Sequence, residues 1–354
     1  MRVAIDATPL TLSSGGLARY TRELSLALAR TFPADEFVLV SDQPFELPAG
    51  GPANLTRGGA PRGVLERRWW LWGLDRELDR LSAGLFHGTN FAVPYIPRRP
   101  SVLTLHDLSP WMNPEWHHAA ERVRARTPVL IELGCATMIV TDTEAVRRQA
   151  VEQFRIHPGR VVAVPLGGLG CGAGAATRTG SGTPYFLFVG TLEPRKNVEG
   201  LVAAWREVRR HHAVDLVLAG RRREDFAPPA EEPGLRVLGE VPDEDLPALY
   251  AGAAALVYPS RYEGFGLPVV EAMQCGTCAI VSRDPALVEV AGGAAVAVEG
   301  ERELAEAMTA VLTDPVRAAG WREQAVRRGR EFSWERTARL TREVYDEARD
   351  RFGD

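Results

Sequence analysis

Short apolar runs alternate with longer segments of helical periodicity along the whole chain. The runs are rich in β-branched residues and predict strands buried on both faces, as in a parallel sheet. The longer segments carry apolar residues three or four positions apart and predict helices that cover such a sheet. This alternation indicates an α/β fold of doubly wound parallel sheets.

The alternation is interrupted once and then starts again. In the first half it predicts strands at 3–6, 37–40, 85–87, 102–105, 138–141 and 161–165, and helices at 17–30, 65–81, 119–133 and 144–154. In the second half it predicts strands at 185–189, 215–218, 237–238, 255–258 and 279–281, and helices at 197–210, 243–251, 267–275, 303–312 and 316–328. A last amphipathic helix is predicted at 334–351.

The interruption, residues 167–183, is rich in glycine and cannot build a core, so we interpret it as a linker. Glycines after a strand are also typical of a dinucleotide-binding turn, but no amphipathic helix follows them here. The expected organisation is a Rossmann-like domain at 1–166, the linker, a second Rossmann-like domain at 184–332, and a helix at 333–354 that crosses back to the first domain. Ligands of open parallel sheets bind at the carboxyl ends of strands, so the chemistry is expected in a cleft between the two domains.

Composition excludes several classes of protein. The 354 residues are 45% hydrophobic and 25% charged, with a net charge of −4, which gives no basic surplus for nucleic acid. No apolar run is long enough to span a bilayer. Asp6 interrupts the N-terminus too early for an apolar signal core, so a cytoplasmic location is expected.

The cysteines are few and scattered, at positions 135, 171, 275 and 278, and they predict neither a disulfide framework nor a zinc site. Cys275 and Cys278 match C-x-x-C, yet they follow a predicted helix instead of opening one, so they are interpreted as turn and core residues. Among 42 basic residues only Lys196 is a lysine, which marks that position for attention.

The strongest motif follows the predicted strand at 255–258. It contains Glu263, then two glycines in the run 264–267, and then Glu271 in the first turns of the predicted helix. Glycines allow close backbone approach, and free N–H groups at a helix start suit a phosphate or a sugar oxygen. A glycine turn with a favourably placed acid is the structural alternative.

A second motif follows the first strand of the second half. Gly190 allows a tight turn, and Arg195 and Lys196 stand where a helix is about to begin, a place that disfavours cations unless an anion binds there. An arginine fork and a lysine point charge would suit a diphosphate. A solvated basic turn is the alternative.

Two weaker signals lie in the first half. The loop with Gly15 and Gly16 joins the first strand to the first helix, and His106 and Asp107 end the strand at 102–105. A histidine at a strand end is often a structural group, but this one is expected to face the cleft.

Together these motifs resemble family 4 of the retaining glycosyltransferases of GT-B fold, over almost the whole chain. The resemblance implies transfer of a hexose from a nucleotide-diphosphate sugar, with retention of configuration and without a metal or other cofactor. The implied partners are that donor and a glycan, lipid-linked or small-molecule acceptor.

The resemblance also assigns roles to residues. His106 and Glu263 are the implied catalytic residues, as positioning and transition-state groups at the donor sugar. The donor-binding residues would be Arg195 and Lys196 at the diphosphate and Glu271 at the ribose. Further donor-binding residues would be Gly16 beside the diphosphate and the backbone amides of Gly264, Phe265, Gly266 and Leu267 at the sugar.

Position 191 departs from the family pattern. Many relatives carry an arginine there, and this chain has Thr191. The variant motif at 190–197 resembles the branch that includes mannosyltransferases of polysaccharide assembly, which favours a mannose-like donor. A sugar-nucleotide epimerase of the same fold and a nucleotide-sugar binding protein without activity are the alternatives.

Two further segments leave choices open. Residues 66–72 mix Glu66, two arginines and three tryptophans, which suits either a peripheral membrane contact of the first domain or a helix that packs its tryptophans inward. Asp243 and Asp245 match the metal-binding D-x-D pattern of another glycosyltransferase fold, but they are predicted to open a helix, where acids are favourable.

Overall fold

The computed structural model describes residues 1–12, 15–117, 120–171, 182–227, 229–230 and 232–353. The chain divides into two compact units. Unit 1 contains Met1–Leu166 and Trp334–Asp354, and unit 2 contains Gly167–Ser333. Most of the predicted linker, residues 172–181, lies outside the described residues.

Unit 1 is built on a parallel sheet in the order β3-β2-β1-β4-β5-β6-β7. Its strands are β1 (Arg2–Asp6), β2 (Glu36–Val40), β3 (Leu55–Arg57), β4 (Leu85–Gly88), β5 (Ser101–Leu105), β6 (Met138–Thr141) and β7 (Val161–Ala163). Its helices are α1 (Gly16–Thr31), α2 (Leu74–Arg80), α3 (Ser109–Met112), α4 (Glu121–Glu132), α5 (Glu144–Phe154) and α12 (Trp334–Arg351). Strands β4, β5 and β6 are buried throughout, which explains their unbroken apolar sequences.

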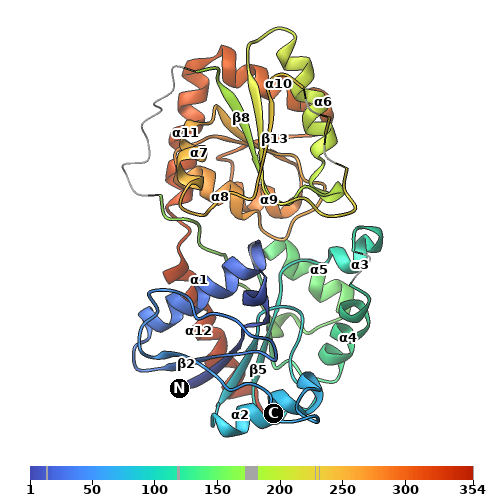
Figure 1. Cartoon of the computed structure of the whole chain (residues 1–354), viewed down its shortest axis with the longest axis vertical. Coiled ribbons are helices and arrows are strands. Elements are labelled where there is room, and N and C mark those ends of the chain that lie inside the picture. Colours follow the sequence, from blue (N-terminus) through green and yellow to red (C-terminus); the bar gives the residue numbers. More distant parts are fainter. Residues whose placement is uncertain (13–14, 118–119, 172–181, 228, 231, 354) are drawn as a thin grey trace. The chain divides into compact units, whose positions relative to one another are not determined.

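Unit 2 repeats the architecture with the order β10-β9-β8-β11-β12-β13. Its strands are β8 (Tyr185–Val189), β9 (Asp215–Ala219), β10 (Leu235–Gly239), β11 (Ala255–Tyr258), β12 (Ala279–Ser282) and β13 (Val296–Val298). Its helices are α6 (Val198–Arg209), α7 (Leu246–Gly252), α8 (Leu267–Gln274), α9 (Pro285–Ala291), α10 (Gly300–Thr313) and α11 (Pro315–Gly329). Figure 1 shows helices flanking the sheet of each unit.

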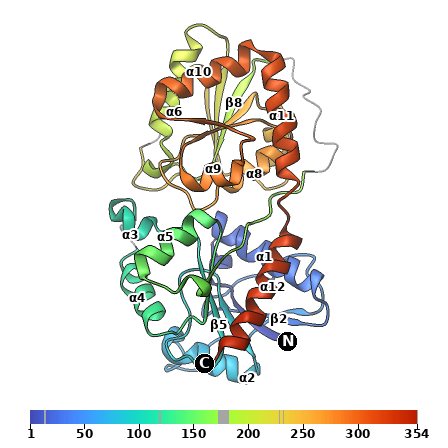
Figure 2. The same ribbon diagram turned by 180° about the vertical axis from the view of Figure 1, so that it is seen from behind.

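Helix α12 returns to unit 1, where it packs against α1, β5 and β6 (Figure 2). Its apolar side carries Val344 and Tyr345, both buried. The Tyr345 hydroxyl lies 2.7 Å from Nδ1 of His87, which is part of strand β4. The last helix is therefore joined to the sheet of unit 1 by both packing and a buried hydrogen bond.

Strand order defines where ligands would bind in each unit. In unit 2, β8 lies between β9 and β11, so the loops that leave β8 and β11 turn to opposite faces of the sheet. Such a switch point opens a crevice at the carboxyl ends of the strands. The corresponding point in unit 1 lies between β1 and β4.

Three predictions about local structure are wrong. The segment 65–81 is not one helix, because a π-helical turn at Trp69–Gly73, in which the Gly73 amide reaches back to the Arg68 carbonyl, precedes the short α2. Helix α7 begins at Leu246 instead of 243, and Asp245 makes no side-chain capping bond.

The third correction concerns the cysteines. The structure joins Cys171 to Cys275 in a disulfide, with the two Cα atoms 5.3 Å apart. The chain after β7 comes close to the end of α8 there, since the Gly170 amide donates to Gln274. Sequence spacing gave no sign of this pair because 104 positions separate the two residues. Cys135 and Cys278 are buried free thiols.

Candidate active site

The loop after β8 carries the two cations that the sequence singles out. Gly190 has a φ of +151°, and its amide donates to the Ala219 carbonyl at the end of β9. A single 3-10 turn, Pro194–Lys196, then presents both basic side chains before α6 begins. Asn197 makes the junction in a left-handed conformation, with a φ of +54°. The tight entry into α6 thus places Arg195 and Lys196 at the carboxyl edge of the sheet.

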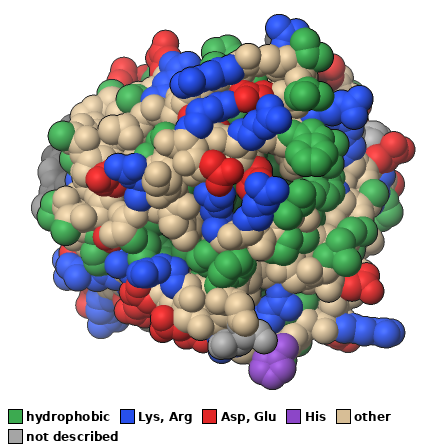
Figure 3. Space-filling model, turned by 90° about the horizontal axis from the view of Figure 1, so that it is seen from below, with side chains coloured by type: hydrophobic (Ala, Val, Ile, Leu, Met, Phe, Trp, Pro, Cys, Tyr) green, Lys and Arg blue, Asp and Glu red, His purple; other side chains and the backbone are tan. Residues whose placement is uncertain are grey.

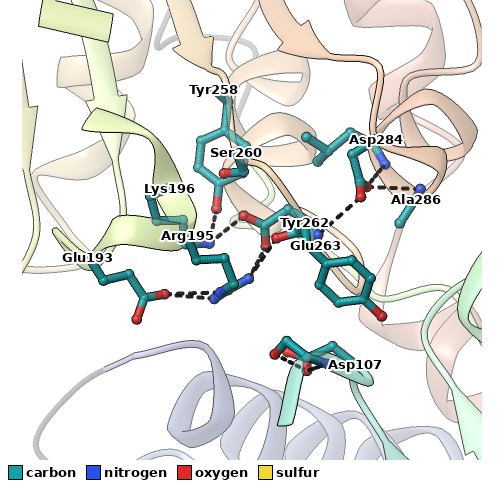
Figure 4. Close-up of polar contacts among 12 residues, drawn as sticks. Asp107, Glu193, Arg195, Lys196, Tyr258, Ser260, Tyr262, Glu263, Asp284 and Ala286 are labelled. Carbon is teal, nitrogen blue, oxygen red and sulfur yellow. Dashed lines mark hydrogen bonds and ion pairs between the residues drawn. The ribbon is translucent and has the colours of Figure 1, made fainter. Parts of the chain in front are cut away.

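Both cations contact Glu263, which comes from the loop after β11 (Figure 4). Lys196 Nζ lies 2.5 Å from Oε1 of Glu263 and 2.7 Å from the hydroxyl of Tyr258. Arg195 Nη1 lies 3.2 Å from Oε2 of the same carboxylate, while Nη2 of Arg195 pairs with Glu193 at 2.9 Å. The loops from β8 and β11 are therefore joined by a charged cluster at the switch point of unit 2.

The cluster is buried, and its members shift the pKa of one another. Burial alone would raise the pKa of Glu263, but Lys196 and Arg195 lower it to about 2. Burial and the neighbouring Arg195 lower the pKa of Lys196, and Glu263 opposes that shift. Glu263 is thus an anion at neutral pH whose charge depends on two cations that a bound phosphate would also attract.

The loop after β11 leads directly into α8. Gly266 is the N-cap of α8 with a φ of +93°, and a Cβ at this position would meet Cδ2 of Leu287 at 2.5 Å. This conformation strongly favours glycine. The run 264–267 therefore places backbone N–H groups at a helix start beside the charged cluster, as an anion-binding turn requires.

Asp284 was not identified from the sequence, although it holds this loop in place. One carboxylate oxygen accepts from the amides of Ala286 and Leu287 at the start of α9, and the other accepts from the Glu263 amide at 3.3 Å. Burial raises the pKa of Asp284 to about 6. An aspartate before Pro285 is a recognisable helix-start signal, so α9 could have been found, but the bond to Glu263 could not.

Glu271, the predicted ribose ligand, lies fully buried on α8. Its Oε2 accepts a hydrogen bond from the Tyr250 hydroxyl at 2.7 Å. Tyr250 on α7 is a partner that the sequence did not reveal. This contact fixes one oxygen of Glu271 against α7.

The predicted residues of unit 1 lie at the carboxyl edge of its sheet. Gly16 begins α1 after Gly15, the N-cap, which has a φ of +110°. His106 follows β5, and its two ring nitrogens lie 2.8 Å from Asp142 Oδ2 and 2.9 Å from the Thr89 carbonyl. Asp142 follows β6 and was missed by the sequence interpretation, since nothing in the chain pattern links it to His106.

The described residues contain neither a cluster of metal ligands nor a membrane-spanning helix. In that part of the chain, no group of three or more His, Cys, Asp or Glu side chains is placed to hold a metal ion. No helix among the same residues is both long and apolar enough to cross a bilayer.

Comparison with known proteins agrees with this geometry. A model described as "Glycosyltransferase Family 4" matches residues 14–167, and one described as "Glycosyl transferases group 1" matches residues 175–330. The O-antigen chain mannosyltransferase B of Escherichia coli is 31% identical and covers 98% of this chain and 99% of its own length.

Solved structures show the same fold. Sucrose-phosphate synthase from Thermosynechococcus elongatus superposes with a TM-score of 0.74 at 20% identity, covering 98% of each chain. Anabaena HepE in complex with UDP-glucose superposes with a TM-score of 0.72 at 16% identity, covering 98% of this chain and all of that one.

The two Rossmann-like units have the GT-B fold, and the family models together with the relative of 31% identity identify the protein as a glycosyltransferase. The chain belongs to family 4 of the GT-B glycosyltransferases.

Proposed function

We propose that this enzyme transfers a mannose-like hexose from a nucleoside diphosphate sugar to a hydroxyl acceptor, with retention of configuration and without a metal. The observation that carries the proposal is the contact of Lys196 and Arg195 with Glu263 at the switch point of unit 2. It supplies two cations and a hydrogen-bond acceptor where a parallel sheet binds its ligand.

The chemistry requires stabilisation of the leaving group. Departure of a nucleoside diphosphate builds negative charge on its phosphates, and two fixed cations with the amides of 264–267 stabilise that charge as it develops. A diphosphate would compete with Glu263 for Lys196 and Arg195. Once released from these cations, the Glu263 carboxylate can accept hydrogen bonds from sugar hydroxyls. These groups do the work that a metal ion does in other phosphate sites.

The remaining roles follow the family resemblance. Glu271, fixed by Tyr250, is proposed to bind the ribose, and Gly16 to lie beside the diphosphate. His106 is proposed to contact the donor sugar. In the reaction the C1–phosphate bond breaks, a bond from C1 to the acceptor oxygen forms, and the leaving phosphate takes the acceptor proton.

A mannosyl donor is supported by two observations. The motif at 190–197 has a threonine after its first glycine, and this variant resembles the branch of the family that includes mannosyltransferases. A relative matched over almost the whole chain carries the name of an O-antigen chain mannosyltransferase. We therefore propose GDP-mannose as the donor and a glycan, lipid-linked or small-molecule hydroxyl as the acceptor.

Incubation with GDP-mannose and a panel of mannose-terminated acceptors tests the proposal. We expect GDP release that depends on an acceptor and is unaffected by EDTA, and an α-linked product by NMR of its anomeric proton. A β-linked product would exclude retention, and loss of activity in EDTA would exclude metal independence. Isomerisation of the donor without any acceptor would identify an epimerase instead.

We also propose a membrane contact for unit 1, at residues 62–72. Trp69 is buried, as expected for a tryptophan that packs inward, whereas Trp72, Leu65 and Val64 are 48%, 61% and 81% exposed and are available to a membrane surface. Glu66 is turned inward against Arg80. Figure 3 shows apolar side chains beside basic and acidic ones on the face that carries α2.

Arg67 and Arg68 are exposed and have no ion-pair partner among the described residues, so the segment 62–72 carries a positive charge beside its exposed apolar side chains. Such a surface is suited to anionic lipid headgroups. We expect sedimentation with vesicles containing phosphatidylglycerol and little with phosphatidylcholine alone. The variant Val64→Ser with Leu65→Ser should lower binding severalfold, while Val316→Ser, at an equally exposed valine in unit 2, should not. Equal vesicle binding by both variants would contradict the proposal that residues 62–72 contact the membrane.

A further inference from the structure

Three loops of unit 1 bring polar groups together around His106. Strands β4, β5 and β6 are neighbours in the sheet, and Thr89, His106 and Asp142 follow them at the carboxyl edge. The side chains of His106 and Asp142 are 12% and 4% exposed, so protein groups are their main hydrogen-bond partners. The positions of the hydrogens can therefore be deduced from the partners.

Both ring nitrogens of His106 face an acceptor. Nε2 lies 2.9 Å from the Thr89 carbonyl oxygen, which can only accept, so Nε2 must carry a hydrogen. Nδ1 lies 2.8 Å from Oδ2 of Asp142, and a hydrogen must lie between these atoms as well. Because an imidazole is more basic than a carboxylate, this second hydrogen belongs on Nδ1. His106 is then an imidazolium with no lone pair left on either nitrogen.

The surroundings of His106 include four other titratable groups. Asp142 and Asp107 are acids, and they raise the pKa of His106, against the effect of burial. His87 on β4 is buried and neutral, since burial lowers its pKa to about 3. Tyr20 of α1 meets the His106 ring edge-on, with the centroids 4.6 Å apart, and its hydroxyl lies 3.1 Å from that of Thr104.

Asp142 provides the negative charge that lies next to the His106 ring. Its Oδ1 is buried and has no hydrogen-bond partner among the described residues, so the bond from His106 is the one contact found for its carboxylate. A buried carboxylate with so few partners is costly unless a cation neutralises it. The pair is therefore mutually dependent: Asp142 keeps His106 charged, and His106 compensates Asp142.

We propose that Asp142 is a positioning residue that holds His106 as an imidazolium with both N–H groups occupied. This inference rests on the proposed function, and it gives His106 a fixed charge and orientation instead of the role of a base. Because neither nitrogen can accept the acceptor proton, that proton passes to the leaving phosphate oxygen as the C1–phosphate bond breaks.

The pH dependence follows from the same hydrogen bonds. The folded state favours the charged ring, so the contribution of His106 is fully present below the ordinary pKa of histidine and is lost as pH rises through the pKa of folded His106. On the acid side the pair persists only while Asp142, whose pKa is raised by burial, stays ionised. Activity should fall on the alkaline side as His106 loses a proton. Replacing Asp142 by asparagine removes the charge and should move this loss to lower pH.

NMR of the histidine ring nitrogens tests the proposal without any substrate. In wild-type protein labelled with ¹⁵N-histidine, both nitrogens of His106, assigned by their absence in His106→Gln, should be protonated at pH 7. Asp142→Asn should lower the titration midpoint by about one to three pH units. The matched control, Asp107→Asn, removes a neighbouring acid that is bonded to Ser109 instead, and it should shift the midpoint much less.

An unprotonated nitrogen on wild-type His106 at pH 7 would overturn the proposal, even if Asp142→Asn fails to fold. Equal shifts in Asp142→Asn and Asp107→Asn would also overturn it. The alkaline limb of kcat should move with the NMR midpoint in Asp142→Asn. Absence of glycosyl transfer in the wild-type protein would refute the proposed function and leave the NMR result standing.

Discussion

Replacing Lys196 by methionine is expected to weaken binding of nucleoside diphosphates by about 10- to 100-fold and to lower turnover with it. Hydrogen bonds to charged groups contribute about 1.5–3 kcal/mol, which corresponds to this range. The same change leaves the buried Glu263 with Arg195 as its remaining cation, so the free energy of unfolding should fall by about 3 kcal/mol. Calorimetric titration and thermal unfolding measure the two effects.

A double variant separates these two effects. Lys196→Met combined with Glu263→Gln removes both charges of the pair and should recover most of the lost stability. Affinity for the diphosphate should stay low because the cation is still missing. Wild-type affinity in this double variant would show that Lys196 serves the fold alone.

Gly220→Ala is expected to disrupt the donor loop through the backbone. Gly220 follows β9 with a φ of +136°, and a Cβ there would lie 2.1 Å from the carbonyl oxygen of Gly190. A rigid backbone atom cannot yield as a side chain can, so Gly190 and the turn with Lys196 must move. We expect a loss of about 3 kcal/mol, or about 6–12 °C in the Tm, together with weaker nucleotide binding.

Gly239→Ala is the matched control. Gly239 ends the neighbouring strand β10 with a φ of +70°, accepts a hydrogen bond from the Gly220 amide, and has open space around its Cβ position. The left-handed conformation alone costs about 1–2 kcal/mol. Nucleotide affinity should be close to that of wild type. Equal losses of affinity in the two variants would contradict the role assigned to the Gly220–Gly190 contact.

The sequence predicted the buried strands well because parallel strands covered on both faces are apolar throughout. Strands β3 and β13 were missed, since each is three residues long and only one of its side chains is buried. The helix expected at 65–81 failed because the turn at Trp69–Gly73 inserts an extra residue into the helical repeat. The spacing of hydrophobic residues along the sequence does not reveal such an insertion.

Composition singled out Lys196, and motif spacing singled out Glu263, but neither predicted that they form an ion pair. The two residues are 67 positions apart and meet because β8 and β11 are neighbours in the sheet. The same reason hid Tyr250 beside Glu271 and Asp142 beside His106. Sequence motifs identified the functional groups at the ends of strands. Their hydrogen-bond and ion-pair partners could not be identified in this way, because they are brought close by the order of strands in the sheet.

The most direct test of the central claim is titration of the wild-type protein with GDP, UDP, ADP and dTDP in the presence of EDTA. We expect selective binding of one nucleoside diphosphate, which is GDP if the donor is GDP-mannose, with a raised melting temperature. We also expect at least tenfold weaker binding of that nucleotide to Lys196→Met with Glu263→Gln. Failure of all four to bind, or equal binding by the double variant, would contradict the assignment of the cluster of Lys196, Arg195 and Glu263 as the diphosphate site.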